Sequence, residues 1–127
     1  MSNRAVISTP AAPDAIGPYS QAVKVGNTVW LSGQIPLVPE SMEMVEGDVS
    51  AQARQVFENL AAVAEASGGT LNDSVKINIS LTDLNDFAAV NEVMAQYLSA
   101  PYPARACVQV AALPRGAAVE IEAILAL

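Results

Sequence analysis

Two stretches of the chain show the three-to-four-residue spacing of apolar positions that is typical of an amphipathic helix. The first follows Asp48 and ends near Ser67, before two consecutive glycines. Aspartate is a favoured N-cap and glycine often follows a helix end, so we expect a helix over about 49–67. Its off-stripe positions are Gln52, Gln55, Glu58, Asn59 and Glu65.

The second helix is expected over about 84–98. Thr82 or Asp83 is a suitable cap, and Pro101 lies beyond its end. Proline disfavours the helical conformation in the residue before it, so this helix should end before Pro101.

The residues between the two helices alternate without interruption over Val75–Thr82, with four aliphatic side chains on one face and four polar groups on the other. This period of two predicts a strand that has one face under a helix. A hairpin with a Gly26-Asn27 turn is expected at 23–31. Further strands are expected at 4–8, 104–110 and 118–127. Prolines keep 10–19 out of any helix, so this segment is expected to be a long ordered loop or a tail lying on the surface.

Together these elements predict an α+β fold with two helices on one face of a mixed sheet. The 127 residues suit one domain, 1–127. We see no run of 18 apolar residues and no basic-then-apolar leader. We therefore expect a cytoplasmic protein without a membrane partner.

Composition narrows the functional classes. Apolar residues make up 52% of the chain and charged residues 15%. This is a larger apolar share than one small core needs, so we expect some apolar residues to lie in a subunit interface. Thirteen acidic and six scattered basic residues give a net charge of −7, which argues against nucleic acid as a partner. With no histidine and only Cys107, a catalytic triad, a zinc finger and an internal disulfide are not expected. We expect no metal site.

Arg105 stands out because it interrupts an apolar strand. It shares one face with Cys107 and Gln109, while alanines and valines form the other. A guanidinium in apolar surroundings needs an anionic partner. One interpretation is that Arg105 forms an ion pair with Glu120 or Glu122 that bridges strands or subunits. The other is that Arg105 binds a substrate carboxylate through two parallel hydrogen bonds.

Four further side chains depart from their local patterns. Glu120 lies between Val119 and Ile121, where desolvation favours a raised pKa and a proton-transfer role, or else it pairs with Arg105. Asn91 falls on the apolar stripe of the second helix. Its amide is expected either to be a core amide that links helix to sheet or to contact a ligand. Cys107 is expected to be a small buried side chain rather than a nucleophile. Tyr19, like Ser32, lies next to glycine or proline, where backbone groups are free to bind a ligand, and each alone is a weak candidate.

Several segments together resemble one family. They are Ile16–Ala22, Leu31–Pro36, Asp83–Asn91, Pro103–Cys107 and Val119–Ala123. In this order they are similar to the RidA (YjgF) family of enamine/imine deaminases, from about residue 8 to the end. The resemblance implies a chorismate-mutase-like fold assembled as a homotrimer, with three clefts between subunits.

The resemblance also implies a reaction, the hydrolysis of 2-imino and 2-enamino acids to 2-oxo acids and ammonia without metal or cofactor. Arg105 would hold the substrate carboxylate and Glu120 would orient or activate water. The cleft would be lined by Tyr19, Ser32, Gly33, Asn91 and Cys107. A short 98–102 connection and Met94, where many relatives carry an aromatic residue, leave the substrate size open.

Two other functions stay open at this point. One is a non-catalytic trimer that binds small carboxylates or client proteins through the same clefts. The other is the ribonuclease or translation-inhibitor activity for which family members have also been named. The acidic net charge and the scattered cations make the latter the weaker alternative.

Overall fold

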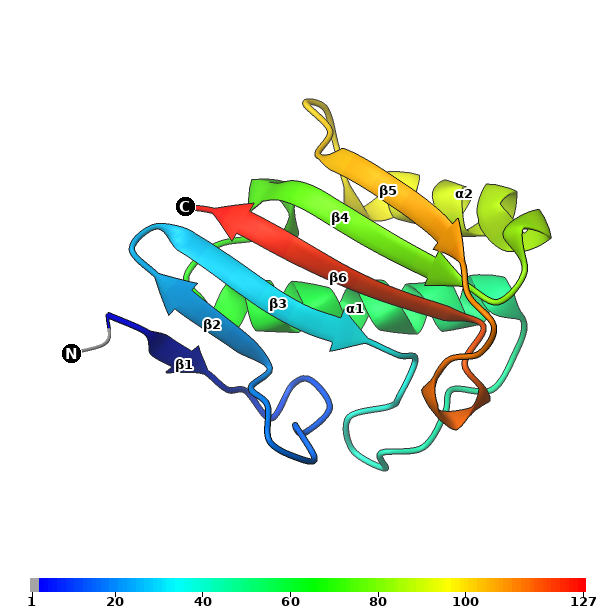
Figure 1. Ribbon diagram of the computed structural model, residues 1–127, viewed down its shortest axis with the longest axis horizontal. Helices are drawn as coiled ribbons and strands as arrows, with labels where there is room; N and C mark the ends of the chain where they lie inside the picture. Colours follow the sequence, from blue (N-terminus) through cyan, green and yellow to red (C-terminus); the bar gives the residue numbers. More distant parts are fainter. Residues whose placement is uncertain (1–2) are drawn as a thin grey trace.

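The computed structural model describes residues 3–127, which form one six-stranded sheet with two helices on one side (Figure 1). The strand order is β1-β2-β3-β6-β4-β5, so the last strand in sequence lies in the middle of the sheet. The strands are β1 Ala5–Ile7, β2 Ala22–Val25, β3 Thr28–Gln34, β4 Ser74–Leu81, β5 Ala104–Gln109 and β6 Val119–Ala126. The helices are α1 Val49–Ala66 and α2 Phe87–Tyr97, with short 3-10 turns η1 Leu71–Asp73, η2 Leu84–Asp86 and η3 Pro114–Gly116.

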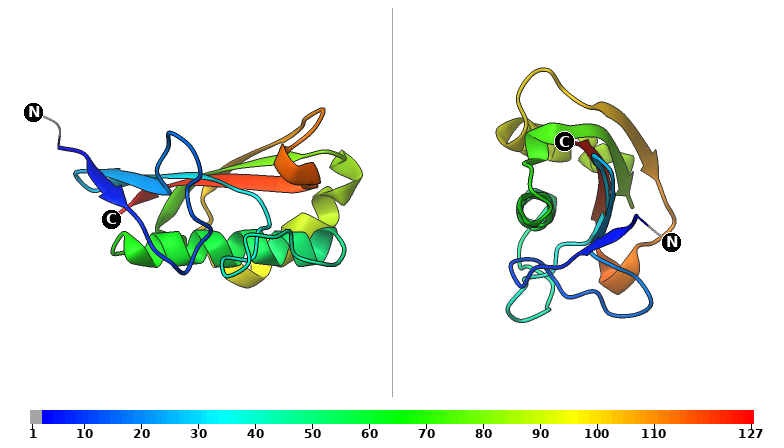
Figure 2. Two further views of the ribbon diagram at one scale, coloured as in Figure 1. Left: turned by 90° about the horizontal axis from the view of Figure 1, so that it is seen from below. Right: turned by 90° about the vertical axis from the view of Figure 1, so that its left-hand side faces the viewer.

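The sheet is mixed, as expected. β4 and β5 run parallel, whereas the other neighbouring pairs are antiparallel. Both helices lie in one layer against the same face, and the sheet curves around α1 (Figure 2). The predicted α+β fold is therefore confirmed.

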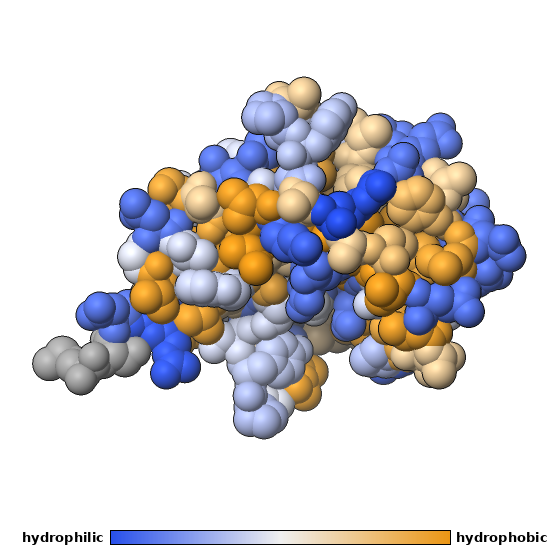
Figure 3. All heavy atoms as spheres, turned by 45° about the horizontal axis from the view of Figure 1, so that its top comes forward, coloured by the Kyte–Doolittle hydropathy of each residue, from blue (hydrophilic) through white to orange (hydrophobic). Residues whose placement is uncertain are grey.

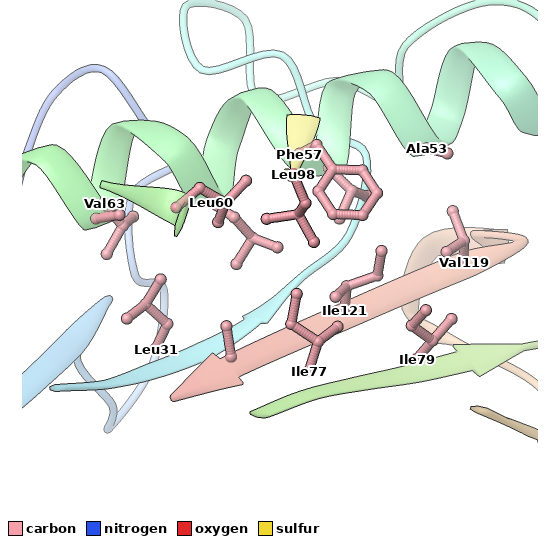
Figure 4. Close-up of a cluster of buried hydrophobic side chains, with 14 of the residues drawn as sticks. Leu31, Ala53, Phe57, Leu60, Val63, Ile77, Ile79, Leu98, Val119 and Ile121 are labelled. Atoms are coloured by element: carbon pink, nitrogen blue, oxygen red, sulfur yellow. The ribbon is translucent and has the colours of Figure 1, made fainter. Parts of the chain in front are cut away.

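Helix α1 supplies the largest share of the core. The Asp48 carboxylate accepts a hydrogen bond from the Ala51 N–H (3.0 Å) and caps the helix, as predicted. Buried side chains of α1, among them Phe57 and Leu60, point at Ile77 and other aliphatics of the sheet (Figure 4). Asn59, predicted to lie off the apolar stripe, is buried, and its Nδ2 donates to the Leu37 carbonyl (2.9 Å).

Three local predictions need correction. Helix α2 begins at Phe87 rather than near residue 84, because the Asp83 carboxylate caps a 3-10 turn by accepting from the Asn85 N–H (2.9 Å). Val75 does not face the core with the other aliphatics of β4, since the register shifts between Ser74 and Lys76 and leaves it exposed. Strand β3 continues past Leu31 to Gln34 through an irregularity in its pairing with β6.

Among residues 3–127, no α-helix covers the second face of the sheet, and this face bears exposed apolar side chains. Trp30 is 46% exposed and Val108 is 52% exposed. Figure 3, in which the top edge of the Figure 1 view comes forward, shows apolar patches interleaved with charged residues. Within residues 3–127, no helix is both long enough and apolar enough to cross a bilayer.

Candidate functional site

Arg105 lies on β5, an edge strand, and its side chain is directed toward α2. It is the register partner of Ile77, which is buried under the helices. Its Nη1 donates to the Asn91 Oδ1 (2.5 Å), and its guanidinium carbon lies 4.9 Å from the centre of the Phe87 ring. Phe87 and Asn91 are one turn apart on α2, so this helix fixes the position of an otherwise exposed cation.

A cavity of about 510 Å³ opens beside this guanidinium. It lies between α2 and the loop that leads into β5. Besides Arg105, its walls are Asn91, Met94, Ala95, Leu98, Tyr102 and Pro103. We call Arg105, Asn91 and this cavity the arginine half-site. Its lining combines the cation of Arg105 with mainly apolar side chains.

Glu120 occupies the opposite face of the sheet. It follows Val119 and precedes Ile121, which are both fully buried on the helix side, so its own side chain points away from the helices. The carboxylate lies against Gly33 of β3, where an added Cβ would be 3.0 Å from the Glu120 Cδ. A side chain at position 33 would therefore push the end of Glu120 by a few tenths of an ångström.

The surroundings of Glu120 shift the pKa of its carboxyl group upward. Burial raises the pKa of its carboxyl group, and the nearby charge of Glu122 raises the pKa further. Glu122 has its own partner, since its Oε1 accepts from the Asn78 Nδ2 (3.1 Å). A carboxyl group whose pKa is raised in this way is better suited to move protons near neutral pH.

Ser32 precedes Gly33 on β3 and is bonded to the backbone of the loop before β2. The Ser32 hydroxyl donates to the Ser20 carbonyl (2.5 Å), and its N–H donates to the Gln21 carbonyl (3.0 Å). Tyr19, which directly precedes Ser20 in this loop, is 54% exposed. We call Glu120, Gly33 and Ser32 the glutamate half-site.

Gln21 was not singled out from the sequence, yet it holds this loop in place. It is buried; its Nε2 donates to the Pro13 carbonyl (2.8 Å), and its Oε1 accepts from the Thr9 N–H (2.7 Å). A polar residue directly before an apolar strand in a proline-rich region was the available signal.

Cys107 is half-buried on the same face of β5 as Arg105 and packs against the core. Burial raises the pKa of its thiol, and the charge of Arg105 offsets part of this shift. The protonated thiol is therefore favoured, which is the expected property of a structural side chain rather than of a nucleophile.

The structure does not bring Arg105 and Glu120 together within one chain. β4 separates their strands, Arg105 pairs with Ile77 while Glu120 pairs with Ser80, and the two side chains lie on opposite faces. Arg105 is therefore not in an ion pair with Glu120 across the strands of one chain; its observed partner is Asn91. Asn91 is exposed, so it is not a core amide, although it does link helix to sheet.

Comparisons of the sequence and of the structure with known proteins indicate the same protein family. The family model described as endoribonuclease L-PSP matches residues 9–127. The 2-iminobutanoate/2-iminopropanoate deaminase of Dermatophagoides farinae is 54% identical over 125 residues, which are 98% of each chain. RidA from the Antarctic bacterium Psychrobacter sp. PAMC 21119 is 63% identical with a TM-score of 0.94, covering 97% of this chain and 99% of that one. E. coli TdcF with bound serine is 45% identical with a TM-score of 0.91, covering 97% and 98%.

Proposed function

The chain belongs to the endoribonuclease L-PSP family, and on this premise we propose that it is a hydrolytic deaminase of 2-imino and 2-enamino acids. Its products are the 2-oxo acid and ammonia. The observation that carries the proposal is the guanidinium of Arg105, held by α2 at the mouth of a cavity. A guanidinium has five N–H donors, and the bond to Asn91 uses one.

A substrate carboxylate fits this arrangement. Asn91 is a neutral acceptor, so it positions the guanidinium without neutralising its charge. The remaining donors suit a planar, two-point contact with a carboxylate. The bound serine of E. coli TdcF is likewise a carboxylic acid with nitrogen on its second carbon, which supports this class of ligand.

We place the complete site between protomers of a homotrimer. The arginine half-site and the glutamate half-site face different directions in one chain, so only a second copy can bring Glu120 toward Arg105. The exposed Trp30 and Val108 on the helix-free face support such an assembly, because isolated monomers rarely leave so much apolar surface uncovered. Closed threefold symmetry then repeats the same site three times.

The reaction needs little more than these groups. Water adds to C2 of the protonated imine while the Glu120 carboxylate takes one of its protons, which gives a carbinolamine. Glu120 returns this proton to the nitrogen. Ammonia then leaves while the carbinolamine hydroxyl gives its remaining proton to the Glu120 carboxylate, so that C2=N becomes C2=O, and Glu120 passes that proton to solvent water. Arg105 holds the substrate carboxylate throughout, and Ser32, Gly33, Tyr19 and Cys107 line the cleft. Since 2-imino acids also hydrolyse unaided, positioning and proton transfer supply the required acceleration.

RNA cleavage, which the description of the family model suggests, has less support. A net charge of −7 repels a phosphate backbone, and the six cations are scattered along the sequence. A trimer that only binds small carboxylates would use the same Arg105, and activity measurements separate it from the enzyme. We place this single domain, 1–127, in the cytoplasm, with neither nucleic acid nor membrane as partner.

The test is ammonia release from 2-iminopropanoate generated in the assay, corrected for the spontaneous rate. Arg105→Lys keeps the charge but loses the planar contact, so we expect kcat/KM to fall roughly 10- to 100-fold. Arg105→Ala should lose more, because Glu120 then faces the substrate carboxylate without a compensating cation. Arg54→Ala, an exposed arginine on α1, is the matched control and should keep parent activity.

Thermal melting separates catalysis from folding. A folded Arg105→Ala protein with little activity supports the proposal. A folded Arg105→Ala protein that releases ammonia at the parent rate overturns the role of Arg105. If the parent protein itself releases no ammonia above the spontaneous rate, the deaminase proposal is overturned in favour of a protein that only binds small carboxylates.

A further inference from the structure

Gln109, the last residue of β5, is bonded to the segment that carries the partners of Arg105. Its Oε1 accepts a hydrogen bond from the Leu84 N–H (2.9 Å), at the first residue of η2. We propose that Gln109 is a positioning residue of the deaminase site, which sets where η2 and α2 lie along β5 and thereby orients the guanidinium of Arg105. This inference rests on the proposed deaminase function, and it requires no contact between Gln109 and the substrate.

The end of β5 is a firm support for this contact. Gln109 is the register partner of Leu81, a fully buried residue of β4. The next N–H along the chain, that of Val110, donates to the Leu81 carbonyl (2.8 Å). Arg105 and Cys107 lie four and two positions before Gln109, so all three side chains leave the strand on the same face. Gln109 therefore reaches the helical segment from the same strand and the same face as Arg105.

Gln109 also completes the hydrogen bonding at the start of the helical segment. The first N–H groups of such a segment have no partner within it. The Asp83 carboxylate accepts from the Asn85 N–H (2.9 Å), and the Asp83 carbonyl accepts from the Asp86 N–H (3.0 Å). The Leu84 N–H has its acceptor on a different strand. The Gln109 bond therefore does what the local cap does not do, since it ties this end of the segment to β5.

The second tie between this segment and β5 is the one that holds Arg105. Its guanidinium donates to Asn91 and lies over the Phe87 ring. From Leu84 to Asn91 the chain makes one 3-10 turn and one α turn, which advance it by about 12 Å. From Gln109 back to Arg105 the strand covers about 13 Å. Because the two spans match, the segment lies antiparallel to β5 and both hydrogen bonds form at once.

The other attachments of α2 are apolar. Val90 and Val93 are buried in the core, and the Tyr97 ring stacks on Phe57 of α1 with 5.4 Å between the ring centres. Apolar packing of this kind is not directional. The bonds to β5 are directional, and they constrain both ends of the stretch 84–91. Loss of the first bond therefore frees this stretch to shift along β5, and the guanidinium donors that remain for a carboxylate shift with it.

The first measurement is KM and kcat of Gln109→Leu for 2-iminopropanoate. Arg105 binds the carboxylate in the ground state and in the transition state alike, so a poorly oriented guanidinium should raise KM by about three- to tenfold and change kcat by less than about twofold. A structural defect gives the opposite pattern, because a smaller folded fraction lowers kcat and leaves KM unchanged. With one hydrogen bond lost, the melting temperature should fall by no more than about 5 °C.

Gln109→Glu tests the acceptor itself. Its carboxylate still accepts from the Leu84 N–H, and the added charge is about 13 Å along the strand from Arg105, beyond the Debye length of about 8 Å at physiological ionic strength. This variant should keep KM within about twofold of the parent value. Gln96→Leu, the same substitution as Gln109→Leu at an exposed position of α2, is the matched control and should leave both constants unchanged.

Two outcomes with an active parent protein overturn the role of Gln109 and leave the deaminase proposal intact. They are a parent KM in Gln109→Leu, and a KM in Gln109→Glu that rises as much as in Gln109→Leu. If the parent releases no ammonia above the spontaneous rate, the deaminase proposal fails, and the dissociation constant of pyruvate from calorimetric titration replaces KM. The same pattern among the three variants then supports the positioning role, whereas a parent protein that binds no pyruvate overturns it.

Discussion

Gly33 is the point at which β3 and the carboxylate of Glu120 come closest. A Cβ at this position would lie 3.0 Å from the Glu120 Cδ, 3.2 Å from its Cγ and 3.3 Å from its Oε2. Carbon atoms in relaxed contact are about 3.5–4.0 Å apart. In Gly33→Ala, the end of Glu120 must therefore move by a few tenths of an ångström.

This displacement should affect catalysis more than stability. A misplacement of about 1 Å can lower a rate by about 100-fold, so for a shift of a few tenths of an ångström we expect kcat/KM of Gly33→Ala to fall by about three- to tenfold. The backbone of Gly33 does not require a positive φ, and alanine is favoured over glycine in a strand by about 0.5–1 kcal/mol. That gain offsets the crowding, so the melting temperature should stay close to that of the parent.

Gly26→Ala is a control that should lower stability and leave catalysis unchanged, the opposite of what we expect for Gly33→Ala. Gly26 has φ +59°, and a Cβ there would meet nothing within 4 Å. Alanine in this left-handed conformation costs about 1–2 kcal/mol, so the melting temperature should fall while deaminase activity below it is kept. Ammonia release and thermal melting of both variants check the pair. A Gly33→Ala protein with parent kcat/KM would refute the role assigned to the position of Glu120.

Three other predictions concern the loop, the pH dependence and the partner class. Gln21→Ala removes the bonds that hold residues 9–13 and should lower the free energy of unfolding by about 1–3 kcal/mol in urea titrations; an unchanged midpoint contradicts this anchoring role. Glu122→Gln removes one cause of the raised pKa of Glu120, so that pKa falls. Because the carboxylate is the proton-accepting form, the acidic limb of the kcat/KM profile should move to lower pH; a shift to higher pH, or none, counts against Glu120 as the base. RNA binding measured at physiological salt should be absent, and tight binding with a steep salt dependence would show that assembly creates a basic surface.

Features that depend on local periodicity were predicted well. The Asp48 cap, the extent of α1 and the placement of its apolar stripe follow from neighbours in sequence. The alternation along β5 also assigned Arg105 and Cys107 to one face correctly. In each case, the relevant contacts are within a few residues, which is the range that a spacing pattern can describe.

Features that depend on strand order could not be predicted in this way. The ion pair considered for Arg105 and Glu120 required neighbouring strands, but β4 lies between β5 and β6. Asn59 was predicted to lie off the apolar stripe, but it is buried, because the loop that contains Leu37 lies against it and supplies a carbonyl acceptor. These partners are distant in sequence, so only the assembled sheet brings them together.

The most direct test of the account is subunit complementation between Arg105→Ala and Glu120→Ala. Each variant alone should release little ammonia from 2-iminopropanoate. If each cleft takes Arg105 from one protomer and Glu120 from another, equal amounts refolded together give intact clefts at about a quarter of the sites. We predict that deaminase activity rises toward that fraction of the parent value. A mixed trimer no more active than the separate variants would contradict the shared site.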